Sequence, residues 1–213
     1  MPAMSPLEAA FCRSAPWRVF ARRLVLPWAL QGQRPTGQVL EIGAGSGAMA
    51  GELMAMFDDI TMSVTDYDDA MVAAAAQRLA PFAARVECRQ ADATALPFAD
   101  GSFDTVLSWI MLHHTMAWEK ALAEVARVLR PGGRLIGYDL LASRPFELLH
   151  RAEGEGHRMI RRGQLEPVLR SLPLENVHLQ VGFGHIVVRF RATGADRVAT
   201  PSVESATERR DAS

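Results

Sequence analysis

Cysteine is scarce in this chain, which has two cysteines among 213 residues. Cys12 and Cys88 lie far apart and outside any spacing that metal sites use. Disulfide-stapled domains and zinc modules need more cysteines at shorter intervals, so the sequence predicts neither a disulfide framework nor a zinc site. Free thiols are typical of a reducing compartment, and we therefore expect a cytoplasmic protein.

The chain also lacks an excess of charge and a long apolar run. Its formal net charge is -1, so we expect no global attraction to nucleic acid or to an anionic membrane. The apolar run from Leu24 to Leu30 is broken by Pro27 and is far shorter than the ~20 residues that span a bilayer. We therefore predict no nucleic-acid partner and no membrane insertion.

The first 40 residues carry five arginines against a single acid, Glu8. Such a bias is a feature of transit peptides. The aromatic and aliphatic residues of this stretch can equally pack on a following domain as two helices, near residues 5–14 and 16–30, the second beginning with Pro16. We expect an N-terminal helical cap over residues 1–34.

Strand and helix patterns alternate along the next hundred residues. Strands are expected at 38–43, 60–66, 84–90, 103–109 and 134–140, and helices at 46–57, 68–80 and 117–129. The segment RPGG at 130–133 is expected to end the last helix, because Pro and Gly stop helices. The alternation predicts a doubly wound α/β domain, Rossmann-like, with a mainly parallel sheet covered by helices on both faces.

The alternation lapses after Leu141 into a mixed, mainly helical stretch that runs to about Leu172. Residues 176–192 then indicate two strands around a turn that holds Gly182 and Gly184. This antiparallel C-terminal hairpin would complete a seven-stranded sheet. We expect one domain over 35–194 and a disordered polar tail over 195–213.

A glycine-rich segment, VLEIGAGSGAMA at 39–50, follows the first expected strand. In doubly wound sheets, ligands bind beyond the carboxyl ends of the strands, and the turn after the first strand approaches them most closely. Gly43, Gly45 and Gly47 let the backbone curl against a ligand, and the next helix offers free N–H groups at its start. With Ala48 the segment also satisfies the dinucleotide pattern G-x-G-x-x-G/A, so an NAD-dependent oxidoreductase is an open alternative.

Acidic residues dominate the region around this turn: between Arg34 and Arg78 there are seven acids and no lysine or arginine. Glu41 and Asp66 lie at or near the carboxyl ends of two expected strands, and Asp66 has the spacing of an acid that binds ribose hydroxyls. Like charges in low dielectric repel by on the order of a few kcal/mol, so Glu41 disfavours a pyrophosphate and favours an ammonium. The pattern favours a ligand with adenosine at one end and a cationic amino acid at the other.

Two longer motifs follow the glycine turn, DATALPFADGSFD at 92–104 and RVLRPGG at 127–133. With them, the chain resembles the class I S-adenosylmethionine-dependent methyltransferases from about Val39 to Leu140. The likeness is strongest to the branch that contains ubiquinone and menaquinone methyltransferases and many small-molecule methyltransferases. It implies S-adenosylmethionine as the cofactor and S-adenosylhomocysteine as its product.

The resemblance also implies a set of cofactor-binding residues. The glycine turn would hold the methionine end of the cofactor, and the acid of the second strand would bind the ribose. The residues after the second and third strands would bind the adenine, and the end of the fourth strand would lie close to the sulfonium. These residues are Glu41, Gly43, Ala44, Gly45 and Gly47, then Asp66, then Tyr67, Asp92 and Ala93, and finally Ser108 and Trp109. Asp92 could instead only cap a turn, Tyr67 could be edge packing, and Trp109 could be part of the core.

Candidate proton acceptors follow the fourth and fifth strands. Transfer from a sulfonium depends mainly on alignment and desolvation, so a catalytic base is optional. The candidates are His113, His114 and Asp139, with Tyr138 nearby, and the resemblance implies that the His pair is commonly structural. A metal at Asp139 would need further carboxylates, so we predict no metal.

Arginine is in excess between residues 141 and 163, where five arginines and two histidines stand against three glutamates. This excess could receive an anionic or phenolate-like acceptor, or it could solvate an amphipathic helix. We predict a methyltransferase that acts on a small molecule. A non-catalytic protein that binds S-adenosylmethionine is the second alternative, and neither the acceptor atom nor the oligomeric state is predicted.

Overall fold

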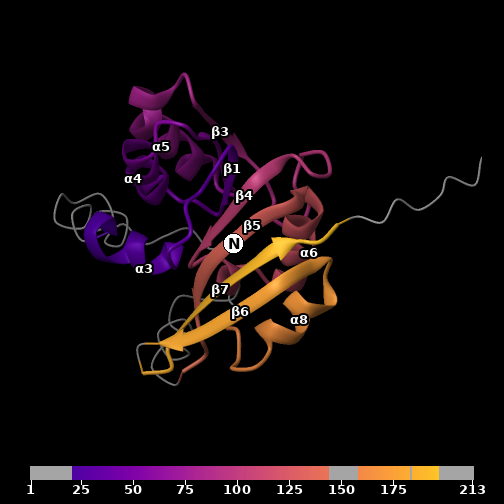
Figure 1. Cartoon of the computed structure of the whole chain (residues 1–213). Coiled ribbons are helices and arrows are strands. Elements are labelled where there is room, and N and C mark those ends of the chain that lie inside the picture. The colour runs from indigo at the N-terminus through magenta and orange to yellow at the C-terminus, as the bar shows by residue number, and fades with distance from the viewer. Residues whose placement is uncertain (1–20, 144–157, 183, 197–213) are drawn as a thin grey trace, which may run out of the picture.

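The computed structural model describes residues 21–143, 158–182 and 184–196, and within them the strands build one seven-stranded sheet in the order β3-β2-β1-β4-β5-β7-β6 (Figure 1). The strands are β1 Gln38–Ile42, β2 Thr61–Asp66, β3 Val86–Gln90, β4 Phe103–Trp109, β5 Leu129–Leu140, β6 Leu174–Gly182 and β7 Val187–Gly194. Neighbours among β1 to β5 pair in parallel, whereas β7 is antiparallel to β5 and to β6. The predicted mainly parallel sheet with an antiparallel C-terminal hairpin is confirmed.

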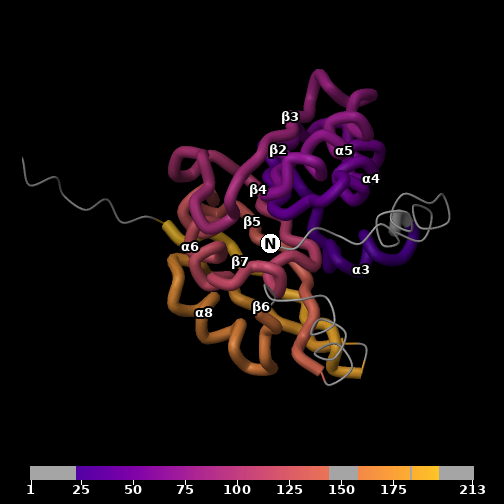
Figure 2. Tube along the Cα trace, turned by 180° about the vertical axis from the view of Figure 1, so that it is seen from behind, coloured from indigo at the N-terminus to yellow at the C-terminus, as the bar shows by residue number. Residues whose placement is uncertain are grey.

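Helices cover both faces of this sheet. They are α3 Leu26–Leu30, which follows the π-turn η1 Ala21–Val25, and α4 Ala48–Met56, α5 Asp69–Leu79, α6 Trp118–Val128 and α8 Leu165–Ser171, with the 3-10 turns η2 Ala80–Phe82 and η3 Leu112–His114. Figures 1 and 2 show α3, α4 and α5 on one side and α6 and α8 on the other, in views from front and back. The doubly wound arrangement is therefore as expected.

Several expectations lie outside the described residues. These are the helix near residues 5–14, the first part of the helix at 16–30, residues 144–157 of the mixed stretch and the tail from 197 onward. Of the described helices, none is long and apolar enough to cross a membrane.

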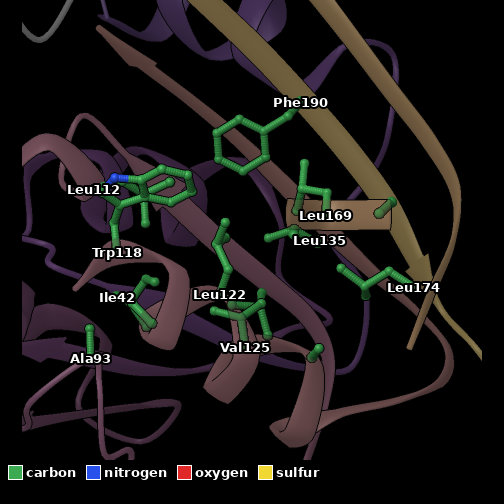
Figure 3. Close-up of a cluster of buried hydrophobic side chains, with 14 of the residues drawn as sticks. Ile42, Ala93, Leu112, Trp118, Leu122, Val125, Leu135, Leu169, Leu174 and Phe190 are labelled. Atoms are coloured by element: carbon green, nitrogen blue, oxygen red, sulfur yellow. The ribbon is translucent and has the colours of Figure 1, made fainter. Parts of the chain in front are cut away.

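The core is split by the sheet into two apolar clusters. On one face, α6 turns Trp118, Leu122 and Val125 toward the sheet at the spacing of three and four residues that one helix face requires, and all three are fully buried (Figure 3). Phe190 of β7 and Leu169 of α8 extend this cluster toward the C-terminal hairpin. Each such side chain contributes roughly 1.5–3 kcal/mol by leaving water, so this face holds the hairpin on the domain.

The RPGG segment is a correction to the sequence analysis. It was expected to end a helix at 117–129, but α6 ends at Val128, and residues 130–133 lie inside β5. The pairing with β4 shifts there, from Phe103 opposite Leu129 to Thr105 opposite Arg134. Such a bulge leaves backbone groups out of the ladder, so it accommodates a proline, which has no N–H to donate.

Arg127 joins the two long motifs to each other. Its guanidinium donates to the carbonyls of Leu96 and Phe98 at 2.9 and 2.8 Å, and it pairs with Asp100 and Glu124 at 2.8 Å each. The hydrogen bonds to the two carboxylates raise its pKa, so the charge is permanent. One side chain of α6 thus fastens the loop that leads into β4.

Candidate cofactor site

The carboxyl ends of β1, β2 and β4 meet at one edge of the sheet because these strands are parallel. Glu41 lies level with Val64 of β2 and Leu107 of β4. Side chains two residues apart share a face, so Glu41, Asp66 and Trp109 all belong to the face that α3, α4 and α5 cover. The register therefore gathers three of the predicted residues on one side of this edge.

The glycine turn after β1 has left-handed backbone at Gly43 and Gly45, with φ values of 60° and 54°. A Cβ on Gly43 would lie 2.6 Å from Cβ of Met111, so the turn touches the loop after β4. Around Gly45 nothing lies within 4 Å of such a Cβ, and a ligand could approach the backbone there. Gly47, at the start of α4, instead packs closely against Ala75 of α5.

Asp66 ties the glycine turn to β2. Its Oδ2 accepts a hydrogen bond of 2.7 Å from the N–H of Gly45, and its Oδ1 accepts one of 3.0 Å from the N–H of Asp68. The N–H of Ala44 donates to the carbonyl of Thr65 at 2.9 Å. The acid predicted to bind ribose thus also shapes the turn predicted to hold the methionine end.

Glu41 is a buried carboxyl group with 1% exposure. Among the described residues, no hydrogen-bond partner reaches its Oε2. Burial, and next the negative charge of Asp66, raise the pKa of Glu41 to about 8. Burying a polar group without a partner is costly, so a donor or a cation at this position would relieve that cost.

The residues predicted beside the adenine lie after β2 and β3. Tyr67 directly follows Asp66, is 49% exposed, and accepts a hydrogen bond of 3.0 Å at its carbonyl from Gln90. Asp92 caps a turn, since its Oδ1 accepts from both the N–H and the hydroxyl of Thr94 at 2.8 Å. Ala93 is buried next to it. Their roles toward a cofactor stay predictions.

Ser108 and Trp109, at the end of β4, point to opposite faces. Ser108 is level with Ile42 and fully buried on the α6 face, whereas Trp109 faces α3. Within the described ranges, neither the Ser108 hydroxyl nor the Trp109 indole N–H has a hydrogen-bond partner. The Trp109 ring lies 5.5 Å from the ring of Tyr138, which lies 5.3 Å from that of Trp28 of α3.

Asp139 anchors the loop after β4. Its Oδ1 lies 2.6 Å from Nδ1 of His113 and accepts 2.7 Å from the N–H of Leu140, while its Oδ2 accepts 2.8 Å from the N–H of Leu112. Asp139 and His113 are 0% and 1% exposed, whereas His114 is half-buried with its ring 4.0 Å from that of His113. Of the residues with described positions, no three His, Cys, Asp or Glu form a group that could hold a metal ion.

Arg158, one of the arginines that could either receive an anionic acceptor or solvate a helix, is held by the loop after β4. Its backbone N–H donates 2.9 Å to the carbonyl of His113, and its guanidinium forms two hydrogen bonds of 2.6 and 2.7 Å with Glu119. These bonds raise the pKa of Arg158 and lower that of Glu119. Arg144 and Arg151 lie outside the described residues.

The sequence analysis missed Ile110. It directly follows β4, has φ of 50°, and is 37% exposed. Its N–H donates 2.9 Å to the carbonyl of Tyr138, which holds the residue in place. A β-branched residue in left-handed backbone is strained, and such strain clusters at functional sites. The sequence gives no sign of this conformation, because left-handed turns are usually signalled by Gly or Asn and residue 110 is neither.

The fold and this strand edge define a Rossmann-like domain of the kind that binds adenosine-containing ligands. Residues 40–137 match the family described as "Methyltransferase domain". This match covers a little under half of the chain, and it supports the resemblance to S-adenosylmethionine-dependent methyltransferases that was stated from the sequence.

Named relatives agree on the class and differ in acceptor. The demethylmenaquinone methyltransferase of Clavibacter sepedonicus is 38% identical over 120 residues, which are 56% of this chain and 45% of that protein. The O-methyltransferase cnsE of Penicillium expansum is 36% identical over 109 residues, 50% of this chain and 39% of that protein. The CurJ carbon methyltransferase shares the fold with a TM-score of 0.71 at 18% identity, over 89% of this chain and 58% of that one. The chain thus spans less than half the length of these two curated relatives.

Proposed function

We propose that the protein transfers a methyl group from S-adenosylmethionine to a small organic acceptor. The observation that carries this proposal is the buried carboxyl group of Glu41 beside the glycine turn, with an oxygen that no described residue contacts. The ammonium of the methionine moiety, directly or through a water molecule, would supply the missing partner. The pyrophosphate of NAD would instead place negative charge next to Glu41 and Asp66.

The remaining cofactor contacts follow from the strand edge. We propose that Asp66 accepts hydrogen bonds from ribose hydroxyls, that Tyr67 lies against the adenine, and that Asp92 and Ala93 bind its amino group and ring edge. The open space at Gly45 would admit the cofactor to the turn between Gly43 and Gly47. When bound, the cofactor supplies an activated methyl group, so the protein's own task is to orient the acceptor and exclude water.

The acceptor would lie beyond β4 and β5, where Trp109, Ile110 and Tyr138 meet. Aromatic walls suit a flat organic molecule, which they contact over a large area. His114 is the better candidate for a base, because His113 is locked against Asp139 in the core. We propose that Asp139 and His113 act on the reaction only by positioning the loop that carries His114.

Product analysis with labelled S-adenosylmethionine tests this function. We expect methylation within a panel of phenols, quinols, amines and carboxylates, and loss of turnover in Glu41→Gln and Asp66→Asn. Asp69→Asn, an exposed acid at the start of α5, is the matched control and should retain activity. Cofactor binding with no turnover on any acceptor would support the non-catalytic alternative, and binding of NAD in its place would support the oxidoreductase.

A further inference from the structure

A cleft lies on the sheet away from the glycine turn. It has a volume of about 240 Å³, and its polar lining comprises Gln33, Arg134 of β5, Asn176 and His178 of β6, and Arg191 and Thr193 of β7. Arg134 is four residues before Tyr138 on the same strand, roughly 13 Å at the rise of a β-strand. The cleft is therefore separate from the proposed methyl-transfer site.

The strand register concentrates positive charge on this face. Arg134 is opposite Thr193, Arg191 lies between Ile136 and His178, and Arg189 lies next along β7 on the same face. Among the described residues, those that line the cleft include no acid, and Glu175 of β6, opposite Thr193, is an acid at its border. Like charges on neighbouring positions of one sheet face repel, so this arrangement lowers stability unless a negative group balances it.

The three arginines differ in what they contact. The guanidinium of Arg189 donates to Gln180 and, at 2.7 Å, to the carbonyl of Trp28, and it lies over the Trp28 ring. Arg134 donates 2.9 Å to the carbonyl of Arg34. In the part of the chain that the structure describes, no hydrogen bond or ion pair is made by the half-buried side chain of Arg191.

The opposite face of the same strands is apolar, so the polar and cationic residues are confined to the face that holds the cleft. There, Leu135, Val188, Phe190 and Ala192 are buried in the cluster that α8 completes. Sheets of doubly wound domains are normally apolar on both faces because helices cover both. The cleft face breaks this pattern with cations, and a sheet face that is merely solvated usually mixes both signs of charge.

We propose that this cleft is a binding site for a small molecule that carries a doubly charged oxyanion, with Arg134 and Arg191 as its principal ligands. The planar guanidinium fork matches phosphate and carboxylate oxygens in bidentate geometry. His178 and Asn176 border the same space and add donors. The site stands independently of methyl transfer.

Binding of inorganic phosphate to the full chain tests the proposal. Malonate is tested in parallel as a dicarboxylate, and chloride at matched ionic strength is the reference anion. We expect saturable binding of phosphate or malonate by calorimetry. Affinity should fall at least tenfold in Arg191→Gln and in Arg134→Gln, and it should be unchanged in Arg170→Gln. Arg170 is an exposed arginine of α8 that pairs with Glu166. A preference between phosphate and malonate identifies the oxyanion, whereas equal weak effects in the native chain and all variants would overturn the site.

Unfolding without any anion gives a second readout. Arg191→Gln should unfold at the same temperature as the native chain or a higher one, since the substitution removes repulsion and breaks no described contact. A marked loss of stability in Arg191→Gln, but not in Arg170→Gln, would show that Arg191 is structural and would contradict the proposal. Affinity for S-adenosylhomocysteine should stay unchanged in Arg191→Gln, which separates this site from the methyl-transfer site.

Discussion

The backbone N–H of Gly45 donates a 2.7 Å hydrogen bond to Oδ2 of Asp66. This bond joins the turn after β1 to the end of β2, so the two parts of the proposed cofactor site depend on each other. The same carboxylate also accepts from the N–H of Asp68 and stabilises the chain where α5 begins. Asp66 should therefore contribute both to stability and to affinity.

Replacing Asp66 with Ala should reveal both contributions. Each of the two lost hydrogen bonds to the carboxylate should lower the free energy of unfolding by at most about 1.5–3 kcal/mol. The loss should be smaller where water takes the place of the carboxylate. Affinity for S-adenosylhomocysteine should fall at least tenfold. Urea denaturation and calorimetry measure the two effects, with Asp69→Asn as control. Unchanged affinity in a folded Asp66→Ala protein would rule out the ribose role.

Glu41 predicts how stability depends on pH. Its pKa is about 8 in the folded protein, against an ordinary value of 4.5. Between pH 4.5 and 8, the folded chain therefore holds a proton at Glu41 that the unfolded chain has released. The free energy of unfolding should thus decrease as pH rises from about 4.5 to about 8, by on the order of a few kcal/mol. In Glu41→Gln this decrease should vanish. Parallel pH profiles of the two proteins in urea denaturation would contradict the assignment.

The pair of His113 and Asp139 should matter for folding rather than for chemistry. Asp139→Ala removes the buried carboxylate that Leu112 and His113 contact, which costs roughly 3–5 kcal/mol. His114→Gln should leave the melting temperature within a few degrees of the native value and lower kcat. The pH profile of kcat is the discriminating measurement: it should lose its acidic limb in His114→Gln, and an unaltered profile would mean that no base acts at His114.

At position 110 we expect Gly to give a more stable protein than Ala, which is the reverse of the usual order. At most positions Ala is more stabilising, but at φ of 50° a Cβ is strained, at a cost of about 1–3 kcal/mol. Ile110→Gly should therefore require more urea to unfold than Ile110→Ala. If the Ala variant were the more stable one, the left-handed conformation would not carry strain.

The order of strands and helices was predictable from the sequence because each parallel strand is a short apolar run followed by a turn signal. The edge that gathers Glu41 and Asp66 was predictable too, since parallel strands end on the same side. The RPGG segment was not. Pro and Gly mark an interruption, but only the pairing with β4 decides whether the interruption is a loop or a bulge within β5.

Other parts of the site depend on long-range contacts that no local pattern reveals. The position of Asp139 near the end of a strand suggested a base, but its two oxygens are used by the loop after β4, as the structure shows. The arginine cleft arises only when β5, β6 and β7 align Arg134, Arg191 and His178, which are far apart in the sequence. The strained turn at Ile110 is likewise set by its neighbours.

Calorimetric titration near neutral pH, in two buffers of different ionisation enthalpy, tests the central claim most directly. If the carboxyl group of Glu41 binds a cation, binding of S-adenosylmethionine should release close to one proton into the buffer. Glu41 would lose this proton when the ammonium of the cofactor lies beside it. Glu41→Gln should bind more weakly and release none, and NAD should not bind. Binding of NAD in preference to S-adenosylmethionine, or cofactor binding without proton release, would contradict the account.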